Sequence, residues 1–272
     1  MFTAATWAQA CDMVTAEMRD FVNSFVTPIS IYDAQSPQFG AAWGTGNYVI
    51  HEDRTFLITA EHNFSRCKPP EWIAHLPDPQ SHYVPIPKNP ITISWPVDAA
   101  SVKVQPLILS IGQVAIPQHL IATHFQAVEM ELFFLLGFPG TNLKRNDPAL
   151  PGARKESWFG VLQLEGKPIT LQRSSAVVNH EAYDQVRHVV LDYPAMGNKV
   201  GEEGFVDFPH PKGLSGSFLW NTRYLETVSN GNKWTPADAR VCGLVIAALE
   251  GPQVILASRI EDIRAGLTGV FA

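Results

Sequence analysis

Prolines and glycines set the strongest limit on what this chain can fold into. The 272 residues include 21 prolines and 19 glycines, and from Pro28 onward these divide the chain into short apolar runs rich in β-branched and aromatic residues. The runs are Ile29–Tyr32, Asn47–His51, Thr55–Thr59, Ile91–Trp95, Leu107–Ile111, Leu132–Phe138, Trp158–Leu164, His188–Leu191, Gly216–Trp220, Val241–Leu249 and Gln253–Ala257. Short apolar runs between turn signals are typical of strands, so the pattern predicts an all-β sandwich or barrel.

The N-terminal segment has helical spacing instead. Between residues 6 and 27, apolar side chains recur at steps of four and three, which places them on one stripe of a helix. The stripe consists of Trp7, Cys11, Val14, Met18, Phe21 and Phe25. Thr6 and Gln9 have capping-box spacing, and Pro28 is expected to end the helix. We interpret the stripe as a face that packs on the body of the protein; the alternative is a docking face for a partner helix or subunit.

Other segments read as loops or as a second helix. Asn, Gly and Pro gather in Lys144–Lys155 and in Tyr224–Arg240, which predicts exposed loops. At the C-terminal end, Ser258 and Glu261 have capping-box spacing, and apolar residues share one face as far as Leu267. We therefore expect a short C-terminal helix after the last strand.

Charge and composition exclude several classes of partner and compartment. The formal net charge is −6 without a cluster of Lys and Arg, so nucleic acid and anionic membranes are poor partners. The longest apolar run, Leu132–Phe138, is much shorter than the roughly 18 residues of a membrane-spanning helix. The start has no basic region followed by an apolar one, so we expect no signal peptide. Three sparse cysteines, Cys11, Cys67 and Cys242, fit a reducing cytoplasm better than a disulfide framework.

The sequence also predicts no cofactor and no metal site. It contains no HExxH, no paired CxxC and no GxxxxGK[ST] phosphate loop, and its nine histidines are scattered.

Two separate segments carry the types of residue that nucleophilic catalysis needs. Residues 44–50 read as a strand opened by glycines, residues 51–54 as a polar turn, and residues 56–60 as a return strand that ends at His62. Far downstream, Ser215 stands between glycines in Gly213-Leu214-Ser215-Gly216-Ser217. A serine hydroxyl is a weak nucleophile near neutral pH and needs a base within hydrogen-bond reach. An imidazole at a rigid strand end can supply that base.

Together these segments resemble the trypsin-like (chymotrypsin-fold) serine proteases, over about residues 29 to 265. The stretch from Gly44 to His62 is similar to the family's first-barrel hairpin, with its threonine-alanine-x-histidine motif. Residues 213–217 are similar to its glycine-x-serine-glycine-glycine motif. Three further segments fit in order: Asp98–Val104 resembles the aspartate motif, Leu136–Gly140 the start of the second barrel, and Cys242–Val245 with Ala257–Ile260 the strands that wall the substrate pocket.

The resemblance implies an architecture: two six-stranded antiparallel β-barrels, with the N-terminal helix and a short C-terminal helix added. We expect the helix within residues 1–28, the barrels at 29–125 and 126–257, and the C-terminal helix within 258–272.

It also implies an activity, that of a serine endopeptidase acting through an acyl-enzyme intermediate on a restricted protein or peptide substrate. Ser215 would be the nucleophile, His62 the base and Asp98 the acid that orients the base. Backbone N–H groups of Gly213 and Ser215 would form the oxyanion hole. The expected substrate-binding residues are His210, Ile246, Ala247 and Ala248. Small apolar side chains favour an uncharged P1 residue; Asp207 or Glu250 pointing inward would favour a basic one, and His210 an acidic one.

Alternatives remain for the site and for the function. Asp78 competes with Asp98 but lies in a proline-rich loop, and Ser217 lacks the flanking glycines of Ser215. An α/β-hydrolase is disfavoured, because there the serine precedes the acid and the histidine. The rival of a different class is a protease-like domain that serves as a binding or sensor module, with peptidase activity absent or switched on by a partner.

Departures from the family bear on regulation. Zymogen-activated members have an aspartate before the serine, which pairs with a new N-terminal amine; here Leu214 stands there. Asn63 replaces the cysteine that follows the histidine in secreted members, and Ser217 replaces the second glycine. These differences place the chain nearer the intracellular bacterial and viral-type members. They leave open whether the oxyanion loop is formed constitutively or is set by a partner or ligand.

Overall fold

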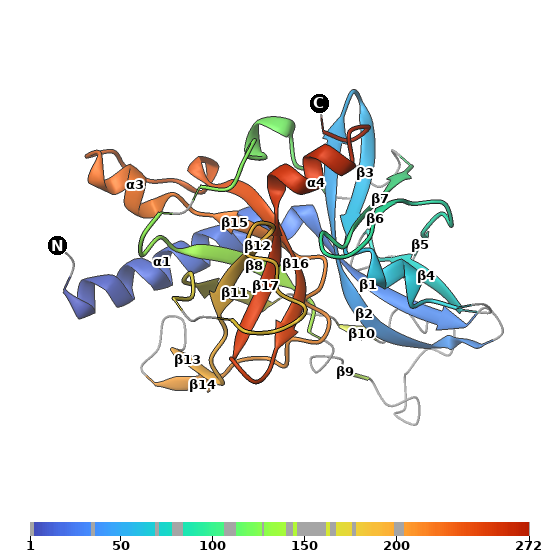
Figure 1. Cartoon of the computed structure of the whole chain (residues 1–272), viewed down its shortest axis with the longest axis horizontal. Helices are drawn as coiled ribbons and strands as arrows, with labels where there is room; N and C mark the ends of the chain where they lie inside the picture. The colour runs from blue at the N-terminus through green and yellow to red at the C-terminus, as the bar shows by residue number, and fades with distance from the viewer. Residues whose placement is uncertain are drawn as a thin grey trace.

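Two curled antiparallel sheets make up most of the molecule, with a long helix before them and a short helix after them (Figure 1). The computed structural model describes residues 3–33, 36–68, 71–77, 84–105, 113–126, 128–139, 144–145, 162–163, 167–175, 178–198 and 204–271. The predicted mostly-β fold with two sheet units and two terminal helices is confirmed, although the first sheet has seven strands and the second has six.

The first sheet is built around a long hairpin. Its order is β5-β4-β1-β2-β3-β7-β6. The strands are β1 (Val26–Asp33), β2 (Ser36–His51), β3 (Arg54–Thr59), β4 (Glu71–His75), β5 (Val84–Pro85), β6 (Ile91–Ile93) and β7 (Ala99–Val104). Glu52 and Asp53 connect β2 to β3 with φ values of 47° and 60°. Such a two-residue turn with positive φ matches strand twist, so the predicted hairpin that leads to His62 is confirmed.

The second sheet has the order β11-β8-β15-β16-β17-β12. Its strands are β8 (Phe133–Gly137), β11 (Lys167–Leu171), β12 (His188–Asp192), β15 (Phe218–Asn221), β16 (Arg240–Leu249) and β17 (Val254–Arg259). Two small ribbons accompany it, β9 (Lys144–Arg145) with β10 (Leu162–Gln163) and β13 (Met196–Asn198) with β14 (Phe205–Asp207). The predicted strand Leu107–Ile111, and most of the predicted loop Lys144–Lys155, lie outside the described residues.

The N-terminal helix is shorter than predicted. Helix α1 spans Ala4–Val22, and its cap is Thr3, whose side chain accepts a hydrogen bond from the N–H of Thr6. After α1, a 3₁₀ turn η1 (Asn23–Phe25) leads into β1, so Pro28 lies inside a strand and does not end the helix. The helical spacing of apolar residues thus continues beyond the end of α1 into the 3₁₀ turn. Spacing alone therefore does not reveal where the helix ends.

The apolar stripe of α1 packs on the second sheet. Val14 and Met18 are fully buried, and α1 contacts β8 and β11. At the C-terminal end of α1, the rings of Phe21 and Phe25 each lie 6.1 Å from that of Trp220 on β15. The stripe is thus occupied by packing within the chain, which supports the first of its two interpretations.

The capping box predicted at the C-terminal helix, Ser258 with Glu261, is wrong, as is the one predicted at the N-terminal helix, where Thr3 is the cap. Helix α4 spans Ile260–Gly266 and begins after Arg259, without a side-chain cap. The hydroxyl of Ser258 donates to the carbonyl of Val97 at 2.7 Å, and the carboxylate of Glu261 accepts from the N–H of Phe125 at 2.7 Å. Ser258 and Glu261 have the spacing of a local cap, but both side chains form hydrogen bonds with distant parts of the chain.

The predicted loop Tyr224–Arg240 contains a helix, α3 (Tyr224–Ser229), and a 3₁₀ turn, η6 (Pro236–Asp238). The helix is held by a distant residue. The buried carboxylate of Glu131 accepts hydrogen bonds from the N–H groups of Leu225 and Glu226 in its first turn. An anion at a helix N-terminus satisfies donors that otherwise lack partners.

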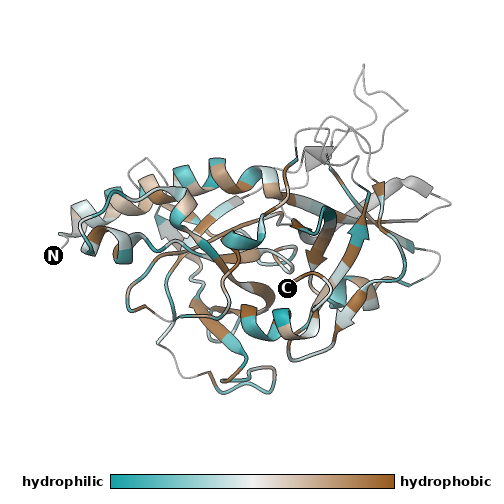
Figure 2. Ribbon diagram, turned by 90° about the horizontal axis from the view of Figure 1, so that it is seen from above, coloured by the Kyte–Doolittle hydropathy of each residue, from teal (hydrophilic) through white to brown (hydrophobic). Residues whose placement is uncertain are grey.

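One hydrophobic cluster joins the two sheets. It includes Val49 and Ile58 from β2 and β3 as well as Phe134 and Trp220 from β8 and β15, all fully buried. In Figure 2, brown hydrophobic segments run along strands of both sheets and teal hydrophilic segments lie on helical turns. Because the sheets share this core, residues on facing strand ends are held at fixed positions relative to one another.

Within the described residues, none of the helices has both the length and the apolar character that crossing a bilayer requires.

A buried histidine in the first sheet makes stability depend on pH. His75 on β4 is 1% exposed, and its Nδ1 lies 2.6 Å from the hydroxyl of Tyr48. Burial lowers the pKa of His75 from 6.5 to about 4, so the folded state keeps it neutral where the unfolded state is protonated. The contribution of His75 to the free energy of unfolding is therefore fully present above pH 6.5. As the pH falls toward 4, the free energy of unfolding decreases by up to about 1.4 kcal/mol per pH unit.

Urea unfolding at pH 7.5 and at pH 5 should show this loss in the wild type and a smaller loss in His75→Gln. Equal losses in the two proteins would show that His75 does not titrate in this way.

Candidate active site

Strand pairing brings His62 to Asp98. His62 begins the single turn α2 (His62–Ser65), just after β3 ends at Thr59. Asp98 directly precedes β7, and because β3 and β7 run antiparallel, Thr59 pairs with Ala100. The end of one strand thus meets the start of the other, and the N–H of Glu61 donates to the carbonyl of Asp98 at 3.2 Å.

The Asp98 carboxylate holds His62 at two points. Oδ1 accepts the backbone N–H of His62 at 2.9 Å, and Oδ2 lies 2.6 Å from the imidazole Nδ1. A carboxylate oxygen at that distance accepts a hydrogen bond, so Nδ1 carries a proton, and in the neutral imidazole Nε2 is then the nitrogen with the lone pair. Asp98 is 3% exposed and has a φ of 51°, a conformation that non-glycine residues seldom adopt. Such a conformation persists where surrounding contacts fix it.

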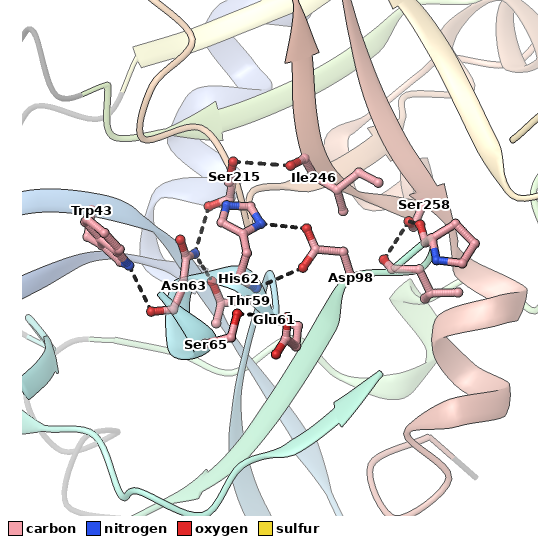
Figure 3. A network of polar contacts seen from close by, with 12 residues as sticks. Trp43, Thr59, Glu61, His62, Asn63, Ser65, Asp98, Ser215, Ile246 and Ser258 are labelled. Atoms are coloured by element: carbon pink, nitrogen blue, oxygen red, sulfur yellow. Dashed lines mark hydrogen bonds and ion pairs between the residues drawn. The ribbon is translucent and has the colours of Figure 1, made fainter. Parts of the chain in front are cut away.

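Ser215 lies on the loop that connects β14 to β15. Its hydroxyl donates to the carbonyl of Ile246 on β16 at 3.5 Å, which is the one hydrogen bond of this hydroxyl among the described residues. Figure 3 shows the imidazole of His62 between the carboxylate of Asp98 and Ser215. Both His62 and Ser215 line the same cavity. Catalytic hydrogen bonds are often long or misaligned before substrate binds, and rotation about χ1 can redirect a serine hydroxyl.

The loop also offers two backbone donors. Among the residues that the structure describes, none accepts a hydrogen bond from the N–H of Gly213 or of Ser215. Both residues line the cavity, and Gly213 has a φ of 100°, which a residue with a side chain rarely adopts. Two such N–H groups could bind an oxyanion that develops in the cavity.

The cavity between the sheets has a volume of about 420 Å³. The first sheet and α2 contribute Trp43, His62, Asn63 and Arg66, and the second half of the chain contributes His210–Gly213, Ser215, Ile246–Ala248 and Glu250. The four residues expected to bind substrate, His210, Ile246, Ala247 and Ala248, therefore all lie on its wall. Asp207 is absent from the lining, and Asp78, the alternative acid, lies outside the described residues.

Charge on the wall is mixed. Arg66 and Lys212 are cationic, and Nε2 of His210 lies 3.9 Å from a carboxylate oxygen of Glu250. Both partners of that pair are mostly exposed, so it contributes little to stability. Trp43 and Arg66 were missed by the sequence argument. Trp43 directly precedes the Gly44-Thr45-Gly46 segment, a position that could have indicated it; Arg66 has no such signal.

Within the described residues, no three His, Cys, Asp or Glu side chains gather in a way that could hold a metal ion.

Gly216 cannot carry a side chain. Its φ is 92°, and a Cβ there would collide with the carbonyl oxygen of Thr45 and with Oγ1 of Thr59. We expect Gly216→Ala to lower the free energy of unfolding by about 3 kcal/mol, from overpacking and from left-handed backbone strain. Chemical denaturation would measure this. Gly251→Ala, in a turn with open space around it, is the matched control and should change stability little. A stable Gly216→Ala protein would contradict the close packing of this loop.

Comparison with known proteins identifies the fold. No protein-family model matches the chain, and no curated protein matches it. Among solved structures it is similar to the serine endoprotease from Yersinia pestis, with a TM-score of 0.52 and 9% identity, over 94% of this chain and 66% of that one. The chain thus spans just under two thirds of that protease.

Two other matches are a protease and a protease domain. The active form of the Rv3671c protease from M. tuberculosis has a TM-score of 0.47 and 14% identity, over 96% of this chain and 86% of that one. The serine protease domain of the Sesbania mosaic virus polyprotein has a TM-score of 0.45 and 12% identity, over 89% and 90%. The likeness to the Yersinia pestis protease, together with the two sheets, shows that the chain has the chymotrypsin-like fold that its sequence predicted.

Proposed function

We propose that this chain is a serine endopeptidase that cleaves peptide bonds with Ser215 as nucleophile, His62 as base and Asp98 as orienting acid. The observation that carries the proposal is the 2.6 Å contact between Asp98 and His62 on the wall of the cavity that Ser215 also lines. The chymotrypsin-like fold supports the same reaction class by analogy.

The reaction begins when the Ser215 hydroxyl turns from Ile246 toward Nε2 of His62. Oγ attacks the carbonyl carbon of the scissile peptide while Nε2 takes the hydroxyl proton. The imidazolium that forms is stabilised by the Asp98 carboxylate at Nδ1. The substrate oxygen, now negative, accepts hydrogen bonds from the N–H groups of Gly213 and Ser215; each such donor stabilises the transition state by about 3–4 kcal/mol.

The second half of the reaction returns the serine. Nε2 gives its proton to the departing amine, the C–N bond breaks, and the acyl group stays on Oγ. A water molecule then attacks the acyl carbon as His62 takes its proton, and Oγ leaves with a proton from Nε2. The product carboxylic acid and the original side chains result.

The cavity wall favours an uncharged P1 side chain. Ile246, Ala247 and Ala248 supply small or apolar surface on β16. The chain would act on one protein or peptide partner rather than on bulk protein. Its three free cysteines are compatible with the cytoplasm, which we propose as its compartment, and its acidic net charge disfavours nucleic acid.

One observation favours a second candidate, a binding or sensor module with absent or partner-dependent peptidase activity. The Ser215 hydroxyl is hydrogen-bonded to Ile246 and not to His62. In that case the cavity would bind a peptide without cleaving it.

Cleavage of a peptide library distinguishes the two. Wild-type protein should release new N-termini with small or apolar residues on the acyl side of the cut, as read by mass spectrometry. The same protein pretreated with a fluorophosphonate is the control and should release none. Peptides retained by the protein but not cut would support the binding module and overturn the peptidase.

A further inference from the structure

The loop that carries Ser215 is held by polar groups of the first sheet. Three of its carbonyl oxygens accept hydrogen bonds from there. The Thr45 hydroxyl donates to the carbonyl of Gly213 at 2.8 Å, the Thr45 N–H donates to that of Ser215 at 2.9 Å, and the Asn47 amide donates to that of Gly216 at 2.6 Å. Thr45 and Asn47 are both fully buried on β2.

These donors are themselves fixed. The Thr45 hydroxyl accepts the N–H of Phe138 at 3.0 Å, and the Thr45 carbonyl accepts the Thr59 hydroxyl at 2.7 Å. Asn63 in turn donates to Oγ1 of Thr59 at 2.8 Å. A buried network in which the members satisfy one another is rigid, and leaving one member unpaired is costly.

The second sheet holds the same loop through apolar contact. Leu214 is 1% exposed and belongs to a cluster with Leu135, Leu219 and Val245. The N–H of Gly216 donates to the carbonyl of Val245 at 2.7 Å. Leu214 therefore anchors the loop at the position where zymogen-activated relatives of this fold use a charged aspartate.

From these contacts we infer that Thr45 is a positioning residue, which fixes the Gly213–Ser217 loop in its catalytic shape from within the folded chain. The inference rests on the proposed function for its catalytic consequence. The hydrogen bonds from the first sheet hold the carbonyl groups of residues 213, 215 and 216 in place. They thereby restrict the orientation of the peptide planes in this loop. Among the residues that the structure describes, the N–H groups of Gly213 and Ser215 remain without an acceptor in this loop shape. The loop is thus formed constitutively, with no need for a new N-terminal amine or a partner.

Thr45→Val removes the hydroxyl while keeping the shape and the backbone N–H. We expect the hydrogen-exchange rates of the Leu214, Gly216 and Ser217 amides to rise by about tenfold, as one lost hydrogen bond loosens the loop. We also expect kcat to fall by roughly ten- to a hundredfold with little change in KM, because a misplaced oxyanion hole weakens transition-state binding. Thr45→Ser, which keeps the hydroxyl, should restore both.

Thr27→Val is the matched control. Thr27 is a fully buried threonine of the same sheet. Its hydroxyl also donates to a backbone carbonyl, that of Leu76 at 2.7 Å with a longer contact to that of Pro28 at 3.3 Å, and it accepts the N–H of Leu76. It should lose stability as Thr45→Val does, yet leave exchange in the loop and kcat unchanged.

Exchange in the loop decides the structural inference whether or not the protein is a peptidase. Unchanged loop exchange in Thr45→Val, or equal changes in Thr27→Val, would overturn it. Faster loop exchange with undiminished kcat would overturn the catalytic role of Thr45. Absence of any peptidase activity in the wild type would instead refute the proposed function, and the exchange result would still stand.

Discussion

Ser215→Ala should lower kcat/KM for peptide cleavage on the order of 10⁶-fold, since it removes the only atom that forms the covalent intermediate. The substitution deletes one oxygen, whose one hydrogen bond to a described residue is the 3.5 Å contact with Ile246. The fold and peptide binding should therefore persist. Steady-state kinetics together with binding of an uncleaved peptide would measure both effects.

Ser217→Ala is the control for that result. Ser217 lies two residues away, is fully buried, and its hydroxyl has no hydrogen-bond partner among the described residues. Loss of this hydroxyl should leave kcat/KM within a few-fold of the wild type. A Ser217→Ala protein that is inactive beside an active Ser215→Ala protein would reverse the assignment of the nucleophile.

Asp98→Asn should lower kcat by about 10⁴-fold near neutral pH while leaving the fold intact. Asparagine has the same shape, and its Oδ1 can still accept the backbone N–H of His62. Its amide would face Nδ1 as a donor, so the imidazole would place its proton on Nε2 and could not accept the serine proton.

Kinetics and thermal unfolding would separate this effect from destabilisation, with Asp192→Asn as the control, because Asp192 is exposed at the end of β12. If Asp98→Asn kept most of the activity, another acid would have to orient His62, and Asp78 would be the first to test.

The sequence pointed to Ser215 and His62 because both have strong local signatures. Ser215 stands between glycines that the loop requires: Gly213 and Gly216 both have positive φ. His62 follows a hairpin whose turn and alternation are readable from a short window. Asp98 has a weaker signature, and its proximity to His62 depends on the pairing of β3 with β7, which no local pattern specifies.

What the sequence did not predict depends on contacts between distant segments. Strands β4 and β11 were not predicted. Strand β4 lies between β1 and β5 in the first sheet, and β11 pairs with β8. Ser258 had the spacing of a cap, yet its hydroxyl bonds Val97 across the molecule. Helix α3 was read as loop because its N-terminal anion, Glu131, lies far away in sequence.

The role of Thr45 was hidden for the same reason. In sequence it is one residue of a strand between two glycines, which predicts only the strand. Its hydroxyl reaches Gly213 from the other sheet, and only the packed structure shows that contact. The contact bears on the question that Leu214 raised, namely how the loop is held without an activating salt bridge.

The most direct test of a nucleophilic Ser215 is the position of the adduct that a fluorophosphonate probe leaves on the native full-length protein, read by tandem mass spectrometry. We predict a single adduct on Ser215. Its formation should be abolished when the protein is denatured before the probe is added and greatly slowed in His62→Ala, because the hydroxyl is nucleophilic only beside its base. Absence of an adduct, an adduct on another serine, or equal labelling of native and denatured protein would contradict the account.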